Sequence, residues 1–322
     1  MKNLTVNKRS GHFEGYWVDL TSKDLTIREL PFELSSVDNK IPTYICSYKN
    51  DTVSWYADGT QVKAMMNRSI TPSNVITHCW YIYEVISQGT KKYKIQSALN
   101  DKYIAASPTQ PDGYTDGLVT LADETSATIF DLDVITGTFR FGGGKYLSVK
   151  SEDSATVNQQ AQNVGVCSDV EFKGCTNSFP LPQVTVSIPN GVGTLYLPFG
   201  VEIPESTGIE ANAGIITDNQ VHLVKYNYIP KFTGAVIRGS KGVSASLKMS
   251  TKPLKWDKNN LRGTCVDAFI PSEETLILGP GPEGKVGFYR GNPKYDKDGN
   301  PGTTHFKLGA GKAYCQYITP TK

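Results

Sequence analysis

The stretch YKIQSALNDKYIAA (residues 93–106) joins an alternating run, a turn and an aromatic-aliphatic pair, and the same order occurs three times in the first half of the chain. The three copies extend from Tyr44 to Ile86, from Tyr93 to Ile135 and from Phe139 to Phe172, and each closes on another alternating run. Their aromatic-aliphatic pairs are Trp55-Tyr56, Tyr103-Ile104 and Tyr146-Leu147. One such unit cannot bury its apolar face alone, so the copies must pack together. Three copies of a four-strand unit predict a β-trefoil.

The second half is again a series of short alternating runs separated by turn residues, from QVTVSI (183–188) to AYCQYI (313–318). This pattern is typical of an antiparallel β-sandwich. Between the halves, SFPLPQ (178–183) is interpreted as an extended connection, because each proline biases its predecessor away from helix. We therefore expect an all-β protein. Residues 1–178 are predicted to form a β-trefoil with an N-terminal extension, and residues 179–322 a β-sandwich-like module.

Charge and hydropathy exclude two classes of partner. The 322 residues include 33 basic and 31 acidic side chains, a net charge of +2, with the signs interspersed. The sequence has no run of Lys and Arg of the kind that would predict a nucleic-acid partner. No apolar stretch approaches the roughly 20 residues that span a bilayer, so membrane insertion is not expected. The first residues lack the apolar core of a signal peptide, which leaves a cytoplasmic protein and a chain trimmed of its leader both open.

Six cysteines leave the disulfide state open, since six thiols allow 15 connectivities. Buried thiols acting as small apolar residues are the alternative to at least one disulfide. No CxxC spacing predicts a zinc or redox site. The pairs considered are Cys167 with Cys175 as a clip at a strand end, and Cys46 with Cys79 or Cys265 with Cys315 across strands.

No motif predicts catalysis, a metal or a cofactor. GPGPEGK (279–285) approaches a phosphate loop, but two prolines remove donors and an alternating run follows, so a hairpin is expected. The segment DKDGN (296–300) opens like a calcium loop, but Pro301 and Lys307 stand where glycine and glutamate are needed, and a solvated turn is expected. The four histidines are scattered without ligand spacing. The protein is expected not to be an enzyme.

Polar and aromatic side chains at the predicted trefoil turns are the candidate ligand contacts. An aromatic face can cover the apolar side of a pyranose while Asp or Asn bonds its hydroxyls. At the same place in each repeat, Tyr56, Tyr103 and Tyr146 are interpreted as core. The predicted ligand-binding residues are Asn50, Asp51, Trp55, Asn100 and Asp101.

Both halves resemble known families. GTLYLPFGVEIPESTGIEANAGI (193–215), ETLILGPGPEGKVGFYR (274–290) and LGAGKAYCQY (308–317) resemble, in order, a β-rich module at the C-terminal end of secreted and surface proteins of Bacteroides-type bacteria. That resemblance implies an extracellular or cell-envelope protein. The turns around Lys102-Tyr103-Ile104 and Lys145-Tyr146-Leu147 resemble those of the ricin-type β-trefoil, although the Q-x-W motif is missing from all three repeats.

The expected function is that of a non-catalytic, secreted or cell-surface binding protein that recognises a glycan through trefoil loops. The alternative is a structural or adhesin-type module, or the accessory region of a larger envelope protein, with a surface protein as its partner. A glycoside hydrolase ranks third, because it needs two carboxylates about 5 to 9.5 Å apart across a cleft, which the sequence alone does not place.

Overall fold

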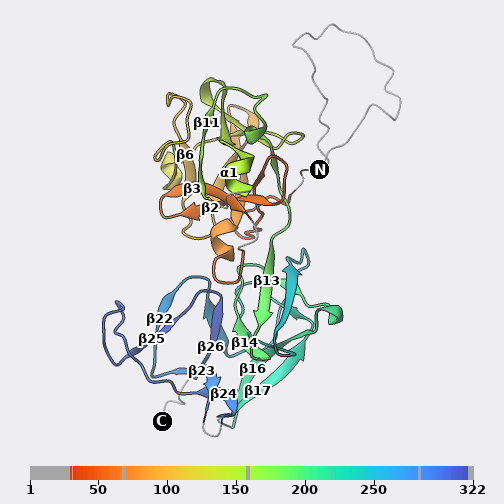
Figure 1. The fold of residues 1–322 in the computed structure, drawn as a ribbon, viewed down its shortest axis with the longest axis vertical. Helices are drawn as coiled ribbons and strands as arrows, with labels where there is room; N and C mark the ends of the chain where they lie inside the picture. The colour runs from red at the N-terminus through yellow and green to blue at the C-terminus, as the bar shows by residue number, and fades with distance from the viewer. Residues whose placement is uncertain are drawn as a thin grey trace.

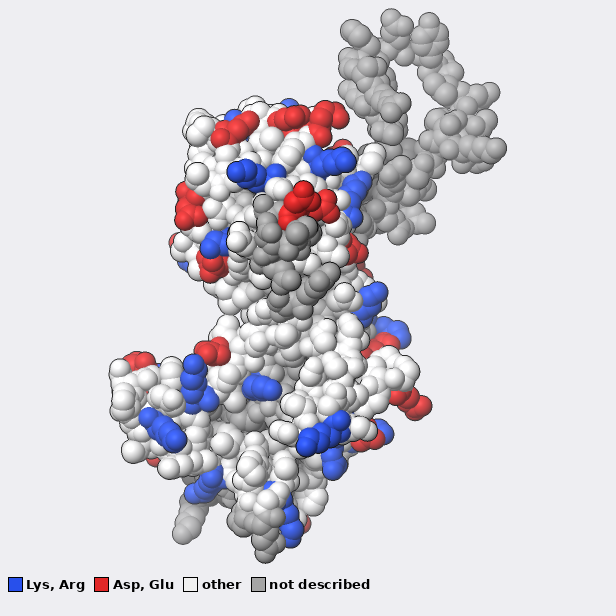
Figure 2. All heavy atoms as spheres, in the orientation of Figure 1, with Lys and Arg blue, Asp and Glu red and all other residues white. Residues whose placement is uncertain are grey.

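The computed structural model describes residue 30 and residues 32–66, 70–156, 160–218, 220–281 and 284–317. In Figure 1 the chain forms two lobes, with the first half above and the second half, entered through β13, below. Among the described residues, no helix is both long and apolar enough to span a membrane. On the face drawn in Figure 2, basic and acidic side chains alternate over the upper lobe, in keeping with their interspersion in the sequence.

Twelve short strands form the upper lobe, four in each repeat. The first unit has β1 (Cys46–Ser47), β2 (Val53–Asp58), β3 (Gln61–Met66) and β4 (Trp80–Ser87). The second has β5 (Thr90–Ser97), β6 (Tyr103–Ala106), β7 (Val119–Ala122) and β8 (Asp131–Asp133). The third has β9 (Thr138–Phe141), β10 (Lys145–Val149), β11 (Gln162–Cys167) and β12 (Asn177–Ser178). The short helix α1 (Glu152–Thr156) connects β10 to β11.

The first and fourth strands of the three units close into a six-stranded ring. Neighbouring units join through the antiparallel pairs β4–β5, β8–β9 and β12–β1. Within the units, the ring is completed by reciprocal backbone bonds of Thr43 with Trp80 and of Tyr93 with Phe130, and by the bond from Asn177 N to Thr136 O. The third strands of the units also meet, since β3 pairs with both β7 and β11. This threefold arrangement is a β-trefoil, as the repeats predict.

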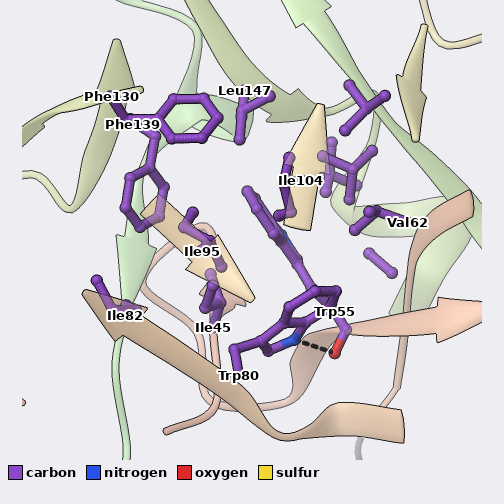
Figure 3. Packing of buried hydrophobic residues seen from close by; sticks show 14 of the residues in the cluster. Ile45, Trp55, Val62, Trp80, Ile82, Ile95, Ile104, Phe130, Phe139 and Leu147 are labelled. Carbon is purple, nitrogen blue, oxygen red and sulfur yellow. Dashed lines mark hydrogen bonds between the residues drawn. The ribbon is translucent and has the colours of Figure 1, made fainter. Parts of the chain in front are cut away.

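The trefoil core holds a fully buried side chain at the equivalent position in the second strand of each unit. These are Trp55 in β2, Ile104 in β6 and Leu147 in β10, and Figure 3 shows them with the other large core residues. The indole of Trp80 donates a hydrogen bond of 3.2 Å to the Trp55 carbonyl. Tyr56, Tyr103 and Tyr146, which the repeat alignment places in the core, are only half-buried. Successive strand side chains point to opposite faces, so the inward side chain in each unit is the immediate neighbour of the tyrosine, Trp55, Ile104 or Leu147.

The lower lobe is antiparallel throughout its paired strands. One four-stranded sheet has the order β14-β19-β16-β17 and another the order β21-β26-β23-β24. Three two-stranded sheets, β13–β20, β15–β18 and β22–β25, complete it. The strands not yet bounded are β13 (Gln183–Ile188), β14 (Val192–Leu195), β15 (Val201–Glu202), β16 (Ile209–Thr217), β17 (Gln220–Tyr226), β18 (Tyr228–Ile229), β19 (Ala235–Gly239), β20 (Val243–Lys248), β21 (Leu261–Thr264), β22 (Ala268–Pro271), β23 (Thr275–Pro280), β24 (Val286–Tyr289), β25 (His305–Leu308) and β26 (Lys312–Gln316).

The two four-stranded sheets pack together like the layers of a sandwich. Val236 of the first sheet and Leu261 and Cys315 of the second form a small buried cluster. The backbone approaches closely here, since a Cβ on Gly214 would lie 3.0 Å from the Leu261 side chain. A larger apolar cluster takes its lower-lobe residues from the segment between β13 and β20 and from Trp256.

The two lobes share part of that larger cluster. Five apolar residues of the first repeat unit, Tyr44, Cys46, Ile70, Val75 and Cys79, pack into it. The Tyr44 hydroxyl also donates a hydrogen bond of 2.6 Å to the carbonyl of Gln183 in β13. The division into domains at residues 178 and 179 stays a prediction, but any separation there cuts through this common core.

Candidate functional site

The first two predicted site residues lie on the turn between β1 and β2. Asn50 donates from its amide to Glu152 at 2.7 Å and accepts from the backbone of Thr52 at 2.9 Å. Asp51 accepts a hydrogen bond of 2.7 Å from the Ser178 hydroxyl of β12. Both side chains therefore bond within the trefoil, and these bonds fix the turn against its neighbours.

The second predicted pair lies on the equivalent turn between β5 and β6. Asp101 has a left-handed backbone with φ of 58° and forms an ion pair of 2.5 Å with Lys40. Asn100 accepts from the backbone of Lys102 at 3.2 Å and donates to the Gly59 carbonyl at 3.4 Å. Among the described residues, no hydrogen bond or ion pair joins this pair to Asn50 or Asp51.

Trp55 is not a ligand contact, and that part of the prediction is wrong. Its side chain has no exposed surface, and its indole nitrogen donates a hydrogen bond of 2.7 Å to Ser47 Oγ. The ring lies 6.1 Å from the ring of Phe139 at an interplanar angle of 50°. A ring enclosed in the core cannot stack on a sugar at the surface, so Trp55 belongs to the folding of the protein.

The third equivalent turn, between β9 and β10, is Gly142-Gly143-Gly144 and carries no side chains. Gly143 and Gly144 have φ values of 69° and 80°, a backbone region that glycine adopts without strain. In the other two units the corresponding place is bridged by a lysine. Lys40 reaches Asp101 beside the β5–β6 turn, and Lys49 of the β1–β2 turn donates to the carbonyl of Ile135. The glycine turn leaves the third place open.

A hollow of 310 Å³ occupies this open place at the boundary between the second and third units. Sites for small molecules are typically about 300 to 1,000 Å³, so this one suits a ligand at the small end of that range. Its lining is mostly polar and comes from the β4–β5 turn, the strands β5, β8 and β9, and the glycine turn. The lining residues are Ser87, Gln88, Lys92, Ile129, Asp131, Arg140, Phe141, Gly142, Gly143 and Gly144.

Three charged side chains give the hollow its electrostatic character. Lys92 and Asp131 form an ion pair, and Asp131 is directly opposite Arg140 across β8 and β9. Among the described residues, the side chain of Arg140 makes no hydrogen bond or ion pair, and it is exposed. Its guanidinium therefore has its five donors available to a ligand. Ile129, with 40% of its surface exposed, adds one apolar contact beside these groups.

Neither Asp131 nor Arg140 is a predicted site residue. Each lies in a short alternating run that reads as an ordinary strand, and the repeat alignment drew attention to the turns that carry side chains. The detectable signal was the absence of side chains in the third copy. A turn that is Asn-Asp in two repeats and Gly-Gly-Gly in the third predicts a space where the others have contacts.

Other motifs have the structural roles expected of them. GPGPEGK connects β23 to β24, which pair as a hairpin. Asp296 accepts hydrogen bonds of 2.9 Å from the backbone of both Asp298 and Asn300, which makes DKDGN a turn closed on its own carboxylate. In the described part of the chain, no three His, Cys, Asp or Glu side chains gather as a metal site would require.

A larger cavity of 410 Å³ lies in the lower lobe, between β14 and the strands β22 to β26. Its walls are largely aliphatic, from residues such as Ile277, Phe306 and Leu308. Polar residues such as Asn190, Thr275 and Lys312 also line it, but its surface is mainly apolar, so it suits a polar ligand less well than the hollow does.

Comparison with known proteins gives little beyond the fold. No protein-family model matches the chain, and no curated protein is significantly similar to it. The expected membership of residues 179–322 in the Bacteroides-type module is therefore unsupported.

Several solved structures are weakly similar to the chain, two of them as follows. One is the lectin of Polyporus squamosus bound to the human-type influenza-binding epitope Neu5Acα2-6Galβ1-4GlcNAc, with 12% identity and a TM-score of 0.33 over 45% of this chain and 50% of the lectin. The other is a mosquitocidal holotoxin, with 11% identity and a TM-score of 0.33 over 88% of this chain and 33% of the toxin. The chain thus spans half or less of either protein. Likenesses at this level carry no functional argument, and the trefoil rests on the strand pairings given above.

Proposed function

We propose that this protein binds a saccharide in the hollow beside the Gly142–Gly144 turn. The observation that carries the proposal is the break in threefold symmetry, since this place is open and polar while its two counterparts are bridged by Lys40 and Lys49.

The chemistry of the lining matches a sugar. Adjacent hydroxyls of a pyranose can bond in pairs to planar groups, and Arg140, Asp131 and Gln88 supply a guanidinium, a carboxylate and an amide. Ser87 adds a hydroxyl, and Ile129 can cover a patch of ring carbons. The volume fits one or two sugar rings better than a long oligosaccharide. Recognition without catalysis, outside the cell or on its surface, is part of the same proposal.

The first test is a glycan array probed with the full chain, followed by calorimetric titration of the strongest hit. A charged hydrogen-bond donor contributes about 1.5 to 3 kcal/mol, so Arg140→Ala should weaken binding about 10- to 100-fold. Asp131→Asn should weaken it as well. The matched control is Asp101→Asn on the closed turn of the second unit, which should bind like the unaltered protein.

Three outcomes would contradict this assignment. Array silence would remove saccharide binding. Binding that survives both Arg140→Ala and Asp131→Asn would move the site elsewhere, and binding lost only in Asp101→Asn would return it to the turns predicted from sequence.

Protein recognition is a second candidate, favoured by strand β17. This seven-residue strand is at the edge of its sheet, and among the strands that the structure describes it pairs with β16 alone. Leu223 and Val224 are each 38% exposed, and the strand carries no proline, so its edge is unguarded against another strand. Capture of one stoichiometric surface protein by the full chain, lost in Val224→Pro, would support this role.

A further inference from the structure

Two cysteines of the third repeat unit converge on one backbone carbonyl. Cys167 ends β11 and Cys175 ends the short 3-10 helix Lys173–Cys175. The Sγ of Cys167 lies 3.6 Å from the carbonyl oxygen of Asp169, and the Sγ of Cys175 lies 3.5 Å from the same oxygen. The backbone N–H of Asp169 also donates to Cys167 Sγ at 3.4 Å. The segment between them therefore folds back so that both thiols meet at its start.

The surroundings of the two thiols are shared. Ser148 Oγ donates a hydrogen bond of 3.3 Å to the Tyr114 hydroxyl. The Tyr114 hydroxyl also interacts with Cys167, and the Ser148 hydroxyl with Cys175. Burial, and then the neighbouring thiol of Cys167, raise the pKa of Cys175 to about 12. Cys167 is partly exposed, whereas Cys175 is buried. One thiol is thus accessible to a reagent and the other lies behind it.

The other four cysteines are placed differently: Cys265 lies near enough to Cys79 to help burial raise its pKa, and both thiols are buried. No disulfide joins any of the six, all of which lie in the described residues. The sequence suggested that Cys265 and Cys315 meet across strands. In the β21–β26 pair, however, Cys315 is opposite Leu261, so the two cysteines are not cross-strand neighbours. Cys46 and Cys79 are both completely buried, out of reach of an oxidant in solution.

We propose that Cys167 and Cys175 are a disulfide-forming pair that closes the segment 168–174 when the protein meets an oxidising small-molecule disulfide such as oxidised glutathione. The thiolate of Cys167 attacks one glutathione sulfur, which forms a mixed disulfide and releases one glutathione. The thiolate of Cys175 then attacks the Cys167 sulfur and releases the second glutathione. The two thiol protons end on the two released glutathiones. The cysteine pair is thus oxidised by two electrons, and oxidised glutathione is reduced by the same two.

The order of the steps follows from access and acidity. Cys167 reacts first because it is exposed, and Cys175 resolves the adduct slowly because little of it is thiolate near neutral pH. Well below a pKa of about 12, the thiolate fraction rises tenfold per pH unit. Resolution should therefore be about ten times faster at pH 8.5 than at pH 7.5, and the mixed disulfide should be visible as an intermediate.

The test treats the full, reduced chain with oxidised glutathione under native conditions and follows its intact mass and peptide map. The expected product has lost two hydrogens, links the peptides of Cys167 and Cys175, and leaves the other four cysteines alkylatable after denaturation. Cys175→Ser should stop at one glutathione on Cys167, and Cys167→Ser should remain unmodified. Cys265→Ser, in the lower lobe, is the matched control and should form the same disulfide as the unaltered chain.

Circular dichroism of each variant before oxidation shows whether it is folded, and only folded variants are compared. An adduct on Cys167 that never converts at pH 8.5 in the unaltered chain would overturn the proposal. A disulfide that involves any of the other four cysteines in its place would overturn it as well.

Discussion

The Nδ1 of His78 lies 2.8 Å from the Oγ of Ser54, and both side chains are buried beside the core that the two lobes share. The rings of Tyr44 and Tyr56 flank the imidazole, at centroid distances of 6.4 Å and 5.4 Å. Burial lowers the pKa of His78 from 6.5 to about 4, because a charged imidazole would lose its hydration there. His78 is therefore neutral in the folded protein at neutral pH.

This burial predicts a loss of stability in mild acid. The folded-state pKa is below that of the unfolded chain, so the unfolded chain takes up the proton first as the pH falls. The His78 contribution is complete above about pH 6.5, is lost between pH 6.5 and pH 4, and changes no further below. A shift of this size corresponds to about 3 kcal/mol. Chemical denaturation across this range should show the loss in the unaltered chain but not in His78→Gln, while the exposed His222→Gln should behave like the unaltered chain.

Replacing Trp55 should affect folding before it affects binding. Trp55→Ala removes a fully buried indole and should lower the free energy of unfolding by about 3 to 5 kcal/mol, from lost burial and from the cavity left behind. Trp55→Phe keeps most of the volume and should cost less, although Ser47 loses its hydrogen-bond donor. Urea unfolding measures both variants. Folded Trp55→Phe should bind any saccharide ligand as the unaltered protein does, and a selective loss of its binding would restore Trp55 as a contact.

The shared core predicts that the lobes unfold together. Val75 is completely buried and packs with apolar residues of the lower lobe, so Val75→Ala should cost about 2 kcal/mol. Because the cluster belongs to both lobes, this change should lower the unfolding midpoint of each lobe. Amide hydrogen exchange can monitor the two lobes separately, in β5 for the upper lobe and in β16 for the lower lobe. Val37, which is 90% exposed, provides the control Val37→Ala, with no expected change. A lowered midpoint in only one lobe would mean that the lobes are energetically independent.

The repeats carried most of the information about the fold. Alternation and turns were enough to predict the four-strand units, because they are set by local chemistry along the chain. The face of each strand was harder, as Trp55 shows. Its neighbour Tyr56 is equally apolar in pattern, and only the closed ring of strands decides which of the two points inward.

The candidate site could not be predicted from the sequence, for a different reason. Asn50, Asp51, Asn100 and Asp101 have the right chemistry for a sugar, but their polar groups bond to neighbouring segments. These bonds join residues up to 127 positions apart, and no local pattern reports them. The open hollow is assembled from β4, β5, β8 and β9, so its existence depends on the packing of units two and three.

Closing the hollow on purpose is the sharpest test of its role. A Cβ at Gly144 would meet no atom within 4 Å, so Gly144→Asp has room for its side chain at the edge of the hollow. Asp101 already adopts a left-handed backbone on the equivalent turn of unit two, which shows that aspartate suits this geometry. The strain should cost about 1 kcal/mol in unfolding free energy. The new carboxylate should pair with Arg140 and displace a ligand, so saccharide binding measured by calorimetry should be lost while the thermal midpoint shifts by only a few degrees. Gly59→Asp, on a turn of unit one that is also open and left-handed, is the matched control for strain alone. Retained binding in Gly144→Asp would mean that the ligand lies outside the hollow.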